Sequence, residues 1–216
     1  VSWPIKRKGQ TFVIRPNPGK LFSFSMPLAL VFKDLLKICK TASEIKTILR
    51  DKEILVDGKR RKNPKYLLGI LDVLSIPLTN EHYRMLINKN GKLHLLKITA
   101  EEANMKIVKV TGKTTLKGKK SQLNLFDGRN IIVKDDKYSI GDSVVLNLPS
   151  QEIKEHIKIE NGTIAYMITG KHKGEFGTIE KVEKGILTVK TKDATIETPK
   201  KTVIAIGKNK PLITMH

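Results

Sequence analysis

The chain has 216 residues, and its 41 Lys and Arg against 21 Asp and Glu give a formal net charge of +20 and a pI near 10.0. This charge favours polyanionic partners, either nucleic acid or an acidic membrane surface. The hydrophobic content of 39% excludes a wholly disordered chain, and the length is compatible with one to three small domains. The single cysteine excludes an internal disulfide. No apolar run approaches the ~20 residues that cross a bilayer, and no secretory signal is visible, so we expect a soluble cytoplasmic protein.

Residues 1–25 contain three prolines, two glycines and the basic cluster Lys6, Arg7 and Lys8. This composition predicts a basic N-terminal arm and not a domain. An arm of this kind either drapes over nucleic acid or frays as a free terminus. The arm begins a strongly basic stretch, since residues 1–65 hold 16 Lys and Arg against 5 Asp and Glu, a net charge of +11. More than half of the excess charge therefore lies in less than a third of the chain.

Residues 26–40 have the period of an amphipathic helix. An apolar stripe repeats at helical spacing, at Leu28, Val31, Phe32, Leu35, Leu36 and Cys39. Because Cys39 lies on that stripe, we interpret it as a core residue and not as a nucleophile. Thr41–Glu44 then fits a capping box. It predicts a second short helix whose inward residues are Ala42, Ile45 and Leu49.

The segment from Glu53 to Tyr66 has the strongest functional pattern. An apolar run ends in Asp57-Gly58, a dipeptide typical of tight turns, and four cations follow at once, Lys59 to Lys62. Such a turn would hold the cations on a rigid corner, where Lys and Arg match phosphate oxygens. A solvated loop is the alternative, since basic runs are weak motifs by themselves. The apolar Leu67 to Ile76 completes a helix–helix–hairpin unit.

Residues 77–160 change to strand-like patterns. Residues 84–88 and 93–98 flank Asn90-Gly91 and predict a β-hairpin, and Thr99–Glu102 marks one short helix. Further strands are predicted at 107–115, 123–126, 131–133 and 144–148. Short strands at this spacing are typical of a small barrel or sandwich.

Residues 161–206 continue in this style, with strands predicted at 163–168, 178–182, 186–191, 194–198 and 203–206. A loop between the first two strands has glycines at 170, 174 and 177, which permit positive φ and close backbone approach. Lys171, His172 and Lys173 stand between them, so backbone N–H groups and cations could meet phosphates there. A β-turn that needs glycine is compatible with the same residues. The tail, residues 207–216, is basic and predicted to be irregular.

The sequence contains no recognisable catalytic constellation. The five histidines are scattered without zinc-ligand spacing, the lone cysteine offers no thiolate pair, and no Walker or dinucleotide-binding glycine loop is present. The acidic pairs Glu101-Glu102 and Asp135-Asp136 are expected to be solvated charges at a helix start and a turn. A binding protein is favoured, although a catalytic triad need not be visible in sequence.

Several motifs in order resemble an S4-type RNA-binding domain followed by a KOW motif, the order of the archaeal and eukaryotic S4e family of small-subunit ribosomal proteins. The matching segments are Pro27-Leu28, Lys33–Lys37, Val56–Lys59, Gly69–Ile76, Thr111–Thr115, Gln122–Asn130, Met167–Gly170 and Ile206–Pro211. The amino-acid sequence of Gln122–Asn130 resembles archaeal members more than eukaryotic members. Two segments depart from the pattern: Pro18–Leu21 replaces the usual Pro-Gly-Pro-His, and Arg60 stands at a usually apolar position.

The resemblance implies an α+β multidomain protein. Its parts would be a basic arm (1–25), a helical-hairpin S4-type RNA-binding domain (26–76), a central β-rich domain (77–160), a KOW-bearing SH3-like β-barrel (161–206) and a basic tail (207–216). It implies a non-enzymatic structural constituent of the small ribosomal subunit in the cytoplasm. The partners would be small-subunit rRNA and neighbouring ribosomal proteins, with no cofactor, metal, membrane or small-molecule substrate.

The candidate RNA-binding residues are cations and their neighbours in each part of the chain. They are Lys6, Arg7, Lys8, Lys33, Lys37, Thr41, Lys46, Lys59, Arg60, Arg61, Lys62, Lys117, Lys119, Lys120, Arg129, Lys171, His172, Lys173, Gly174, Lys208 and Lys210. Recognition would combine neutralisation of phosphates with shape, since aromatic residues are only 5% of the chain. Two alternatives remain: a free KOW-type transcription or translation factor, and an RNA-modifying enzyme that carries an S4-type module.

Overall fold

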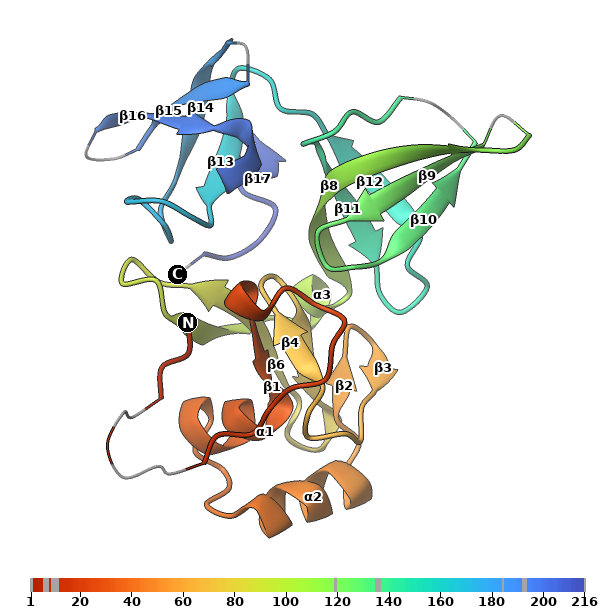
Figure 1. Ribbon diagram of the computed structural model, residues 1–216, viewed down its shortest axis with the longest axis vertical. Helices are drawn as coiled ribbons and strands as arrows, with labels where there is room; N and C mark the ends of the chain where they lie inside the picture. The colour runs from red at the N-terminus through yellow and green to blue at the C-terminus, as the bar shows by residue number, and fades with distance from the viewer. Residues whose placement is uncertain are drawn as a thin grey trace. The chain divides into compact units, whose positions relative to one another are not determined.

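The computed structural model describes residues 2–5, 8, 12–118, 120–134, 137–183, 185–191 and 194–215 (Figure 1). Of the candidate binding residues, Lys6, Arg7 and Lys119 lie outside these ranges, as does the acidic pair Asp135-Asp136. The chain forms two compact units. The first comprises Val1–Asn88 and Lys92–Lys106, and the second comprises Lys89–Gly91 and Ile107–His216. Among the described helices, none combines the length and the apolar character needed to cross a membrane.

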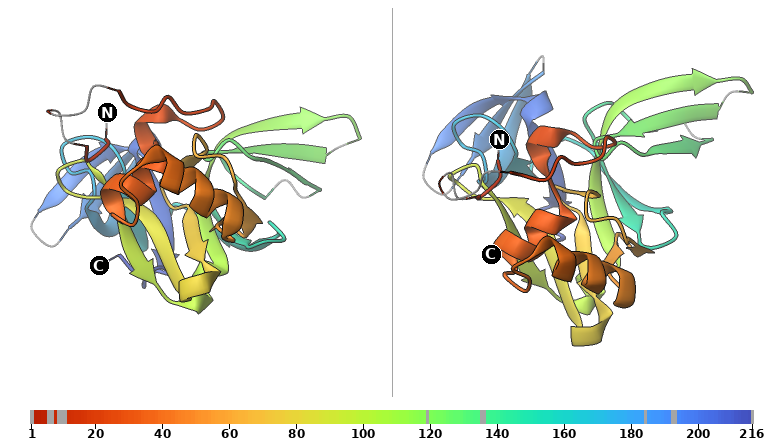
Figure 2. Two further views of the ribbon diagram at one scale, coloured as in Figure 1. Left: turned by 90° about the horizontal axis from the view of Figure 1, so that it is seen from below. Right: turned by 60° about the horizontal axis from the view of Figure 1, so that its bottom comes forward.

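The first unit contains a five-stranded antiparallel sheet with strand order β3-β2-β5-β6-β7. Figure 2 shows α1 and α2 side by side against these strands. A separate antiparallel pair joins β1 to β4. The elements are η1 (Phe22–Phe24), β1 (Ser25–Pro27), α1 (Leu28–Leu30), η2 (Val31–Leu35), α2 (Ala42–Asp51), β2 (Leu55–Val56), β3 (Lys59–Arg60), β4 (Leu67–Gly69), β5 (Val73–Ile76), η3 (Pro77–Thr79), β6 (Glu81–Ile87), β7 (Leu93–Ile98) and α3 (Ala100–Ala103).

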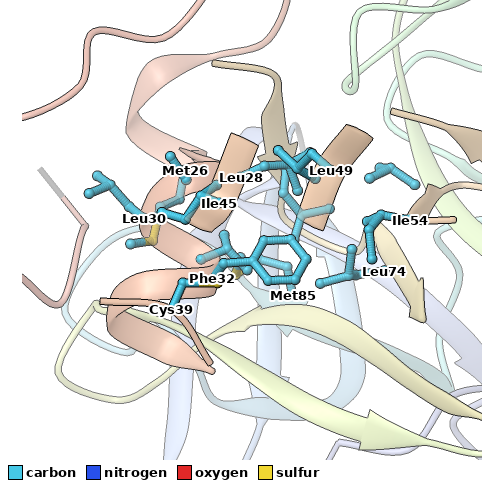
Figure 3. Packing of buried hydrophobic residues seen from close by; sticks show 14 of the residues in the cluster. Met26, Leu28, Leu30, Phe32, Cys39, Ile45, Leu49, Ile54, Leu74 and Met85 are labelled. Atoms are coloured by element: carbon cyan, nitrogen blue, oxygen red, sulfur yellow. The ribbon is translucent and has the colours of Figure 1, made fainter. Parts of the chain in front are cut away.

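The helix predicted over 26–40 is shorter than its apolar period indicates. Its first residues belong to strand β1, and the helical turns α1 and η2, the latter a π-helical segment, end at Leu35. Lys37 adopts a φ of 56°, a left-handed conformation that a continuing right-handed helix excludes. Cys39 is nevertheless buried in the core, as predicted (Figure 3).

Helix α2 begins as predicted. The Thr41 hydroxyl accepts a hydrogen bond from the Glu44 amide at 3.2 Å, while the Glu44 carboxylate accepts from the Thr41 amide at 3.4 Å. Both bonds of a capping box are therefore formed. Ile45 and Leu49 enter the core, but Ala42 is exposed, because the first turn of α2 lies outside the packed face.

The N-terminal arm has the predicted irregular backbone, but its tryptophan is part of the core. Trp3 is 5% exposed, and its indole Nε1 donates to the carbonyl oxygen of Ser25 at 2.6 Å. The amide of Leu93 also donates to the carbonyl of Ser2 at 2.8 Å. The start of the arm is thus anchored on the first unit, which excludes the alternative of a terminus that is frayed at residues 2 and 3.

The Asp57-Gly58 turn and the hairpin of residues 84–98 form as predicted. Val56 pairs with Lys59 across the first turn, and Met85 pairs with Leu95 in the β6–β7 hairpin. The division expected after Ile76 differs from the observed packing, because Ile76 of β5 pairs with Glu81 of β6 in one continuous sheet. The first compact unit accordingly continues to Lys106.

The second unit contains two five-stranded antiparallel sheets with strand orders β10-β9-β8-β11-β12 and β16-β15-β14-β13-β17. Its elements are β8 (Met105–Leu116, beginning in the first unit), β9 (Lys120–Leu125), β10 (Asn130–Val133), β11 (Ser143–Asn147), β12 (Ile153–Ile157), β13 (Thr163–Met167), β14 (Phe176–Glu183), β15 (Ile186–Lys190), β16 (Thr195–Pro199), η4 (Lys200–Thr202) and β17 (Val203–Lys208). Every strand predicted here is present. Strand β12 was not predicted, because its central residues are polar, and it pairs with β11.

The C-terminal tail was predicted to be irregular from residue 207, but strand β17 continues to Lys208 and only the described residues after it are irregular. The tail is also not wholly free. Ile213 is 2% exposed, and the amide of Leu212 donates to the carbonyl of Ile206 at 3.0 Å. These contacts return the described tail to its own unit after the basic residues.

Candidate nucleic-acid interface

A buried charge cluster braces the turn that precedes the basic run. Asp57 and Gly58 adopt φ values of 51° and 72°, which are typical of a tight hairpin turn. The Asp57 carboxylate is buried, where it accepts from the Val73 amide at 3.0 Å and from Lys106 Nζ at 2.8 Å. The turn is therefore fixed by a side chain from within and not only by its backbone.

The same ammonium group reaches a second buried carboxylate. Lys106 Nζ lies 2.6 Å from Asp72 Oδ1, while Asp72 Oδ2 accepts from the Gly69 amide at 2.5 Å and from Lys20 Nζ. Burial alone would raise the pKa of the Asp72 carboxyl, but the charges and hydrogen bonds of Lys106 and Lys20 outweigh burial and hold its pKa below the usual range. The cluster thus pairs two buried carboxylates with two cations, and Lys106 contacts both carboxylates.

The four cations after the turn differ in what they contact. Lys59 and Lys62 are exposed, and their side chains form no hydrogen bond or ion pair with the described residues. Arg60 Nη2 donates to the carbonyl of Arg50 at 3.0 Å, near the end of α2. Arg61 is half-buried with its guanidinium 4.3 Å from the centroid of the Tyr66 ring. The arginines thus have structural contacts, whereas the lysines are presented to solvent.

The candidates on and beside the helices of the first unit are also unequal. Lys37 and Lys46 are exposed and Lys33 is half-buried. The Thr41 hydroxyl is already an acceptor in the capping box, so its first role is structural. Lys8 of the arm is exposed.

Further cations line the β8–β9 hairpin, which Figure 2 shows extending from its sheet. Lys117 and Lys120 are exposed at the tip of that hairpin. Arg129 follows β9 but is half-buried, and its Nε lies 3.2 Å from Asp127 Oδ2. The two lysines are available to a polyanion, while Arg129 is engaged within the protein.

The glycine loop of residues 170–177 combines turn geometry with cations. Gly170 and Gly174 have φ values of 90° and 83°, and the Gly174 amide donates to the carbonyl of Met167 at 2.8 Å. His172 Nδ1 is 3.2 Å from Glu175 Oε2, so this candidate has an acidic partner in the loop. Lys171 is exposed, Lys173 is half-buried, and the tail candidates Lys208 and Lys210 are exposed.

Gly177 needs glycine for a different reason from Gly174. It lies in strand β14 opposite Ala165 without a positive φ, and an added Cβ would lie 2.4 Å from the backbone oxygen of Lys190. Close approach of strand β15, and not left-handed backbone, therefore excludes a side chain here.

Sequence reasoning missed the buried charges. Lys106 and Lys109 lie in the first half of strand β8, where the other residues are apolar, and this was the one available signal. Glu102, expected to be solvated, instead lies 3.1 Å from the buried guanidinium of Arg84. No cluster of three or more metal-ligating His, Cys, Asp or Glu side chains occurs in the part of the chain that the structure describes.

Comparison with known proteins matches two family models. Residues 79–153 match the ribosomal family S4e, and residues 35–74 match the S4 domain. The chain is 41% identical to the small ribosomal subunit protein eS4 of Methanococcus vannielii, over 99% of this chain and 93% of the relative. It is 38% identical to the protein of the same name from Methanocaldococcus jannaschii, over 100% of this chain and 93% of the relative.

A solved structure is similar as well. The crystal structure of the 30S ribosomal protein S4e from Thermoplasma acidophilum has a TM-score of 0.75 and 34% sequence identity, and the match covers 85% of this chain and 95% of that one. Sequence and fold therefore agree over nearly the whole length.

Proposed function

Since the chain belongs to the S4e family of ribosomal proteins, we propose that it is a structural constituent of the small ribosomal subunit, where it binds and stabilises rRNA during subunit assembly and translation. Its work would be done in the cytoplasm, beside small-subunit rRNA and neighbouring ribosomal proteins. The family is structural and not enzymatic, so the proposal includes no catalytic residue and no cofactor.

The braced β2–β3 turn is the observation that carries the proposal. Its buried carboxylate cluster fixes the backbone, while Lys59 and Lys62 stay exposed directly after the turn. Because the backbone of the turn is already fixed, only the lysine side chains lose conformational freedom when they meet phosphates, which supports binding by neutralisation and by the shape of folded RNA.

In this proposal both units contribute RNA-binding residues. Residues 26–76 act as the S4-type RNA-binding part of the first unit, and residues 77–160 act as a central β-rich part whose first strands complete the sheet of that unit. Residues 161–206 act as an SH3-like barrel whose KOW motif contains the 170–177 loop, and the arm and tail add further cations. A five-stranded antiparallel sheet of short strands and the positive φ of Gly174 support the last assignment.

A free KOW-type transcription or translation factor is the first competing function, and it is tested by sedimentation. A ribosomal constituent should co-sediment with small subunits through moderately high salt, whereas a transient factor should wash off. An RNA-modifying enzyme is the second. Turnover of an RNA substrate by the purified protein would establish it and overturn our proposal.

We expect that replacing Lys59 and Lys62 together with alanine weakens binding to small-subunit rRNA and leaves stability nearly unchanged. Each lost phosphate contact should reduce the slope of log K against log salt by roughly 0.7–0.9. Filter binding at several salt concentrations, beside thermal melts, measures both effects. Arg60 and Arg61 are less suitable, because their contacts with Arg50 and Tyr66 tie them to the fold.

The matched control replaces two exposed lysines outside the candidate set, Lys134 and Lys154, with alanine. The control removes the same formal charge from the second unit, so the net charge of the protein changes equally in both double variants. An equal loss of affinity in both double variants would show that net charge, and not the braced turn, determines binding.

A further inference from the structure

The second unit contains a pocket of about 460 Å³, and none of the candidate RNA-binding residues lines it. It is formed by strand β8, the residues after β9, the turn before β11 and the helical turn η4. Its apolar wall includes Val110, Phe126 and Ile140. The volume is in the range of ligand pockets of proteins. Ile140 is 57% exposed, so the pocket is open to the surface beside that side chain.

The charged residues that line the pocket are all lysines: Lys109, Lys200 and Lys201. Lys109 Nζ donates to the backbone carbonyl oxygens of Lys200, Lys201 and Val203 at 2.7, 3.0 and 2.7 Å. These acceptors are neutral, and no ion pair of Lys109 occurs among the described residues. Burial and then the charge of Lys200 lower the pKa of Lys109 to about 8. At neutral pH the pocket wall therefore has a positive charge that no carboxylate balances.

The Lys200 side chain lies along the same wall. An added Cβ on Gly141 would be 2.1 Å from Lys200 Cε. The Lys200 side chain therefore occupies the space that a side chain at position 141 would need. Lys201 is exposed next to it. The apolar surface and the cations thus lie within one opening.

We propose that this pocket receives an unstacked nucleotide of RNA, with its base against Phe126 and Ile140 and its phosphate on Lys200 and Lys201. The inference rests on the proposed function and specifies one of its contacts. Proteins recognise RNA largely through bases that leave the stack and lie on aromatic or apolar side chains, with Lys or Arg on the adjoining phosphate. An anion there would also offset the buried charge of Lys109.

The test compares Ile140→Glu with Ile132→Glu in the full chain. Both isoleucines are exposed on the second unit, at 57% and 61%, so each variant adds one carboxylate to the surface, but only position 140 lines this pocket. The probe is a fluorescent single-stranded uridine decamer, read by anisotropy. We expect Ile140→Glu to weaken its binding about tenfold, as for the loss of one stacked base with its phosphate, and Ile132→Glu to leave it within about twofold.

Two further probes identify the ligand. A duplex of the same length should be insensitive to Ile140→Glu, because its bases stay stacked. Competition by uridine monophosphate as strong as that by the decamer would mean a site for free nucleotides and would overturn the assignment to RNA. Photo-crosslinking of a 5-iodouridine decamer should label the peptide that contains Phe126 in the wild type and in Ile132→Glu, but not in Ile140→Glu.

Binding of the wild-type chain to small-subunit rRNA distinguishes a failure of this inference from a failure of the proposed function. If the wild-type chain binds rRNA, but Ile140→Glu binds the decamer normally or the crosslink lies elsewhere, the pocket assignment is wrong and the proposed function stands. If the wild-type chain fails to bind rRNA in filter binding, the proposed function fails and the pocket assignment with it.

Discussion

Replacing Lys106 with methionine is expected to lower the free energy of unfolding of the first unit by about 3–5 kcal/mol, as for other broken buried ion pairs. Methionine matches the length of the lysine stem but removes the ammonium group that lies 2.8 Å from Asp57 and 2.6 Å from Asp72. Two buried carboxylates would then share much less positive charge. Hydrogen exchange at the backbone amides of β2, β5 and β6, followed in increasing denaturant, measures the loss within the first unit.

The pH dependence of this loss has a definite sign. In the wild type the folded pKa of Asp72 lies below the unfolded value near 3.9, so its ionised form stabilises the protein above that pH, and this stabilisation is lost as the pH falls through the folded pKa. Without Lys106, only Lys20 opposes the burial of Asp72, so we expect the folded pKa of this carboxyl to rise above the unfolded value. The folded variant then binds protons more tightly than the unfolded chain, so the gap in stability between wild type and variant should narrow from pH 7 to pH 5.

The double variant Lys106→Met with Asp72→Asn is the matching control. It removes one of the stranded charges along with the cation, so its cost should be smaller than the sum of the two single variants. Strict additivity, or a loss that does not depend on pH, would mean that packing of the lysine stem and not the charge cluster accounts for the effect.

The second large effect is expected at Gly177. Alanine there would place a carbon 2.4 Å from the backbone oxygen of Lys190, which requires β14 and β15 to separate. Overpacking of this kind typically costs about 1–3 kcal/mol. We therefore expect Gly177→Ala to lower the melting temperature of the second unit and, by displacing the adjoining loop, the affinity for small-subunit rRNA.

The comparison that separates fold from binding is Lys171→Ala combined with Lys173→Ala. Neither lysine has a hydrogen bond or ion pair with another described residue, so stability should stay within about 0.5 kcal/mol while rRNA affinity falls. Calorimetry of the full chain beside filter binding tests both expectations. Equal destabilisation by both variants with unchanged binding would make the loop purely architectural.

What could be predicted from the sequence was encoded locally. The capping box at Thr41 and the Asp57-Gly58 turn each depend on residues within three positions of one another, and both formed as predicted. Strand periods in the second unit were equally local. Strand β12 was missed because its centre is polar on both faces, so the alternation that reveals an edge strand is weak.

The remaining features depend on distant partners. Lys106 is meaningful only beside Asp57 and Asp72, which are 49 and 34 positions away in sequence. The early end of the first helix depends on a left-handed Lys37, and lysine gives no sign of that conformation in advance. The same limit applied to the arginines, since nothing near Arg60 and Arg61 in sequence predicts that they contact α2 and Tyr66.

The anchored N-terminus has a practical consequence for spectroscopy. Trp3 is the sole tryptophan of the chain, and its ring lies 4.8 Å from that of Phe22 inside the first unit. The fluorescence emission of Trp3 should therefore shift to longer wavelength only when the first unit unfolds and exposes the indole ring to water. The far-ultraviolet circular dichroism signal, in contrast, is the sum of both units. Overlaying the two signals in one titration would reveal, without any label, whether the halves of the molecule unfold together or one after the other.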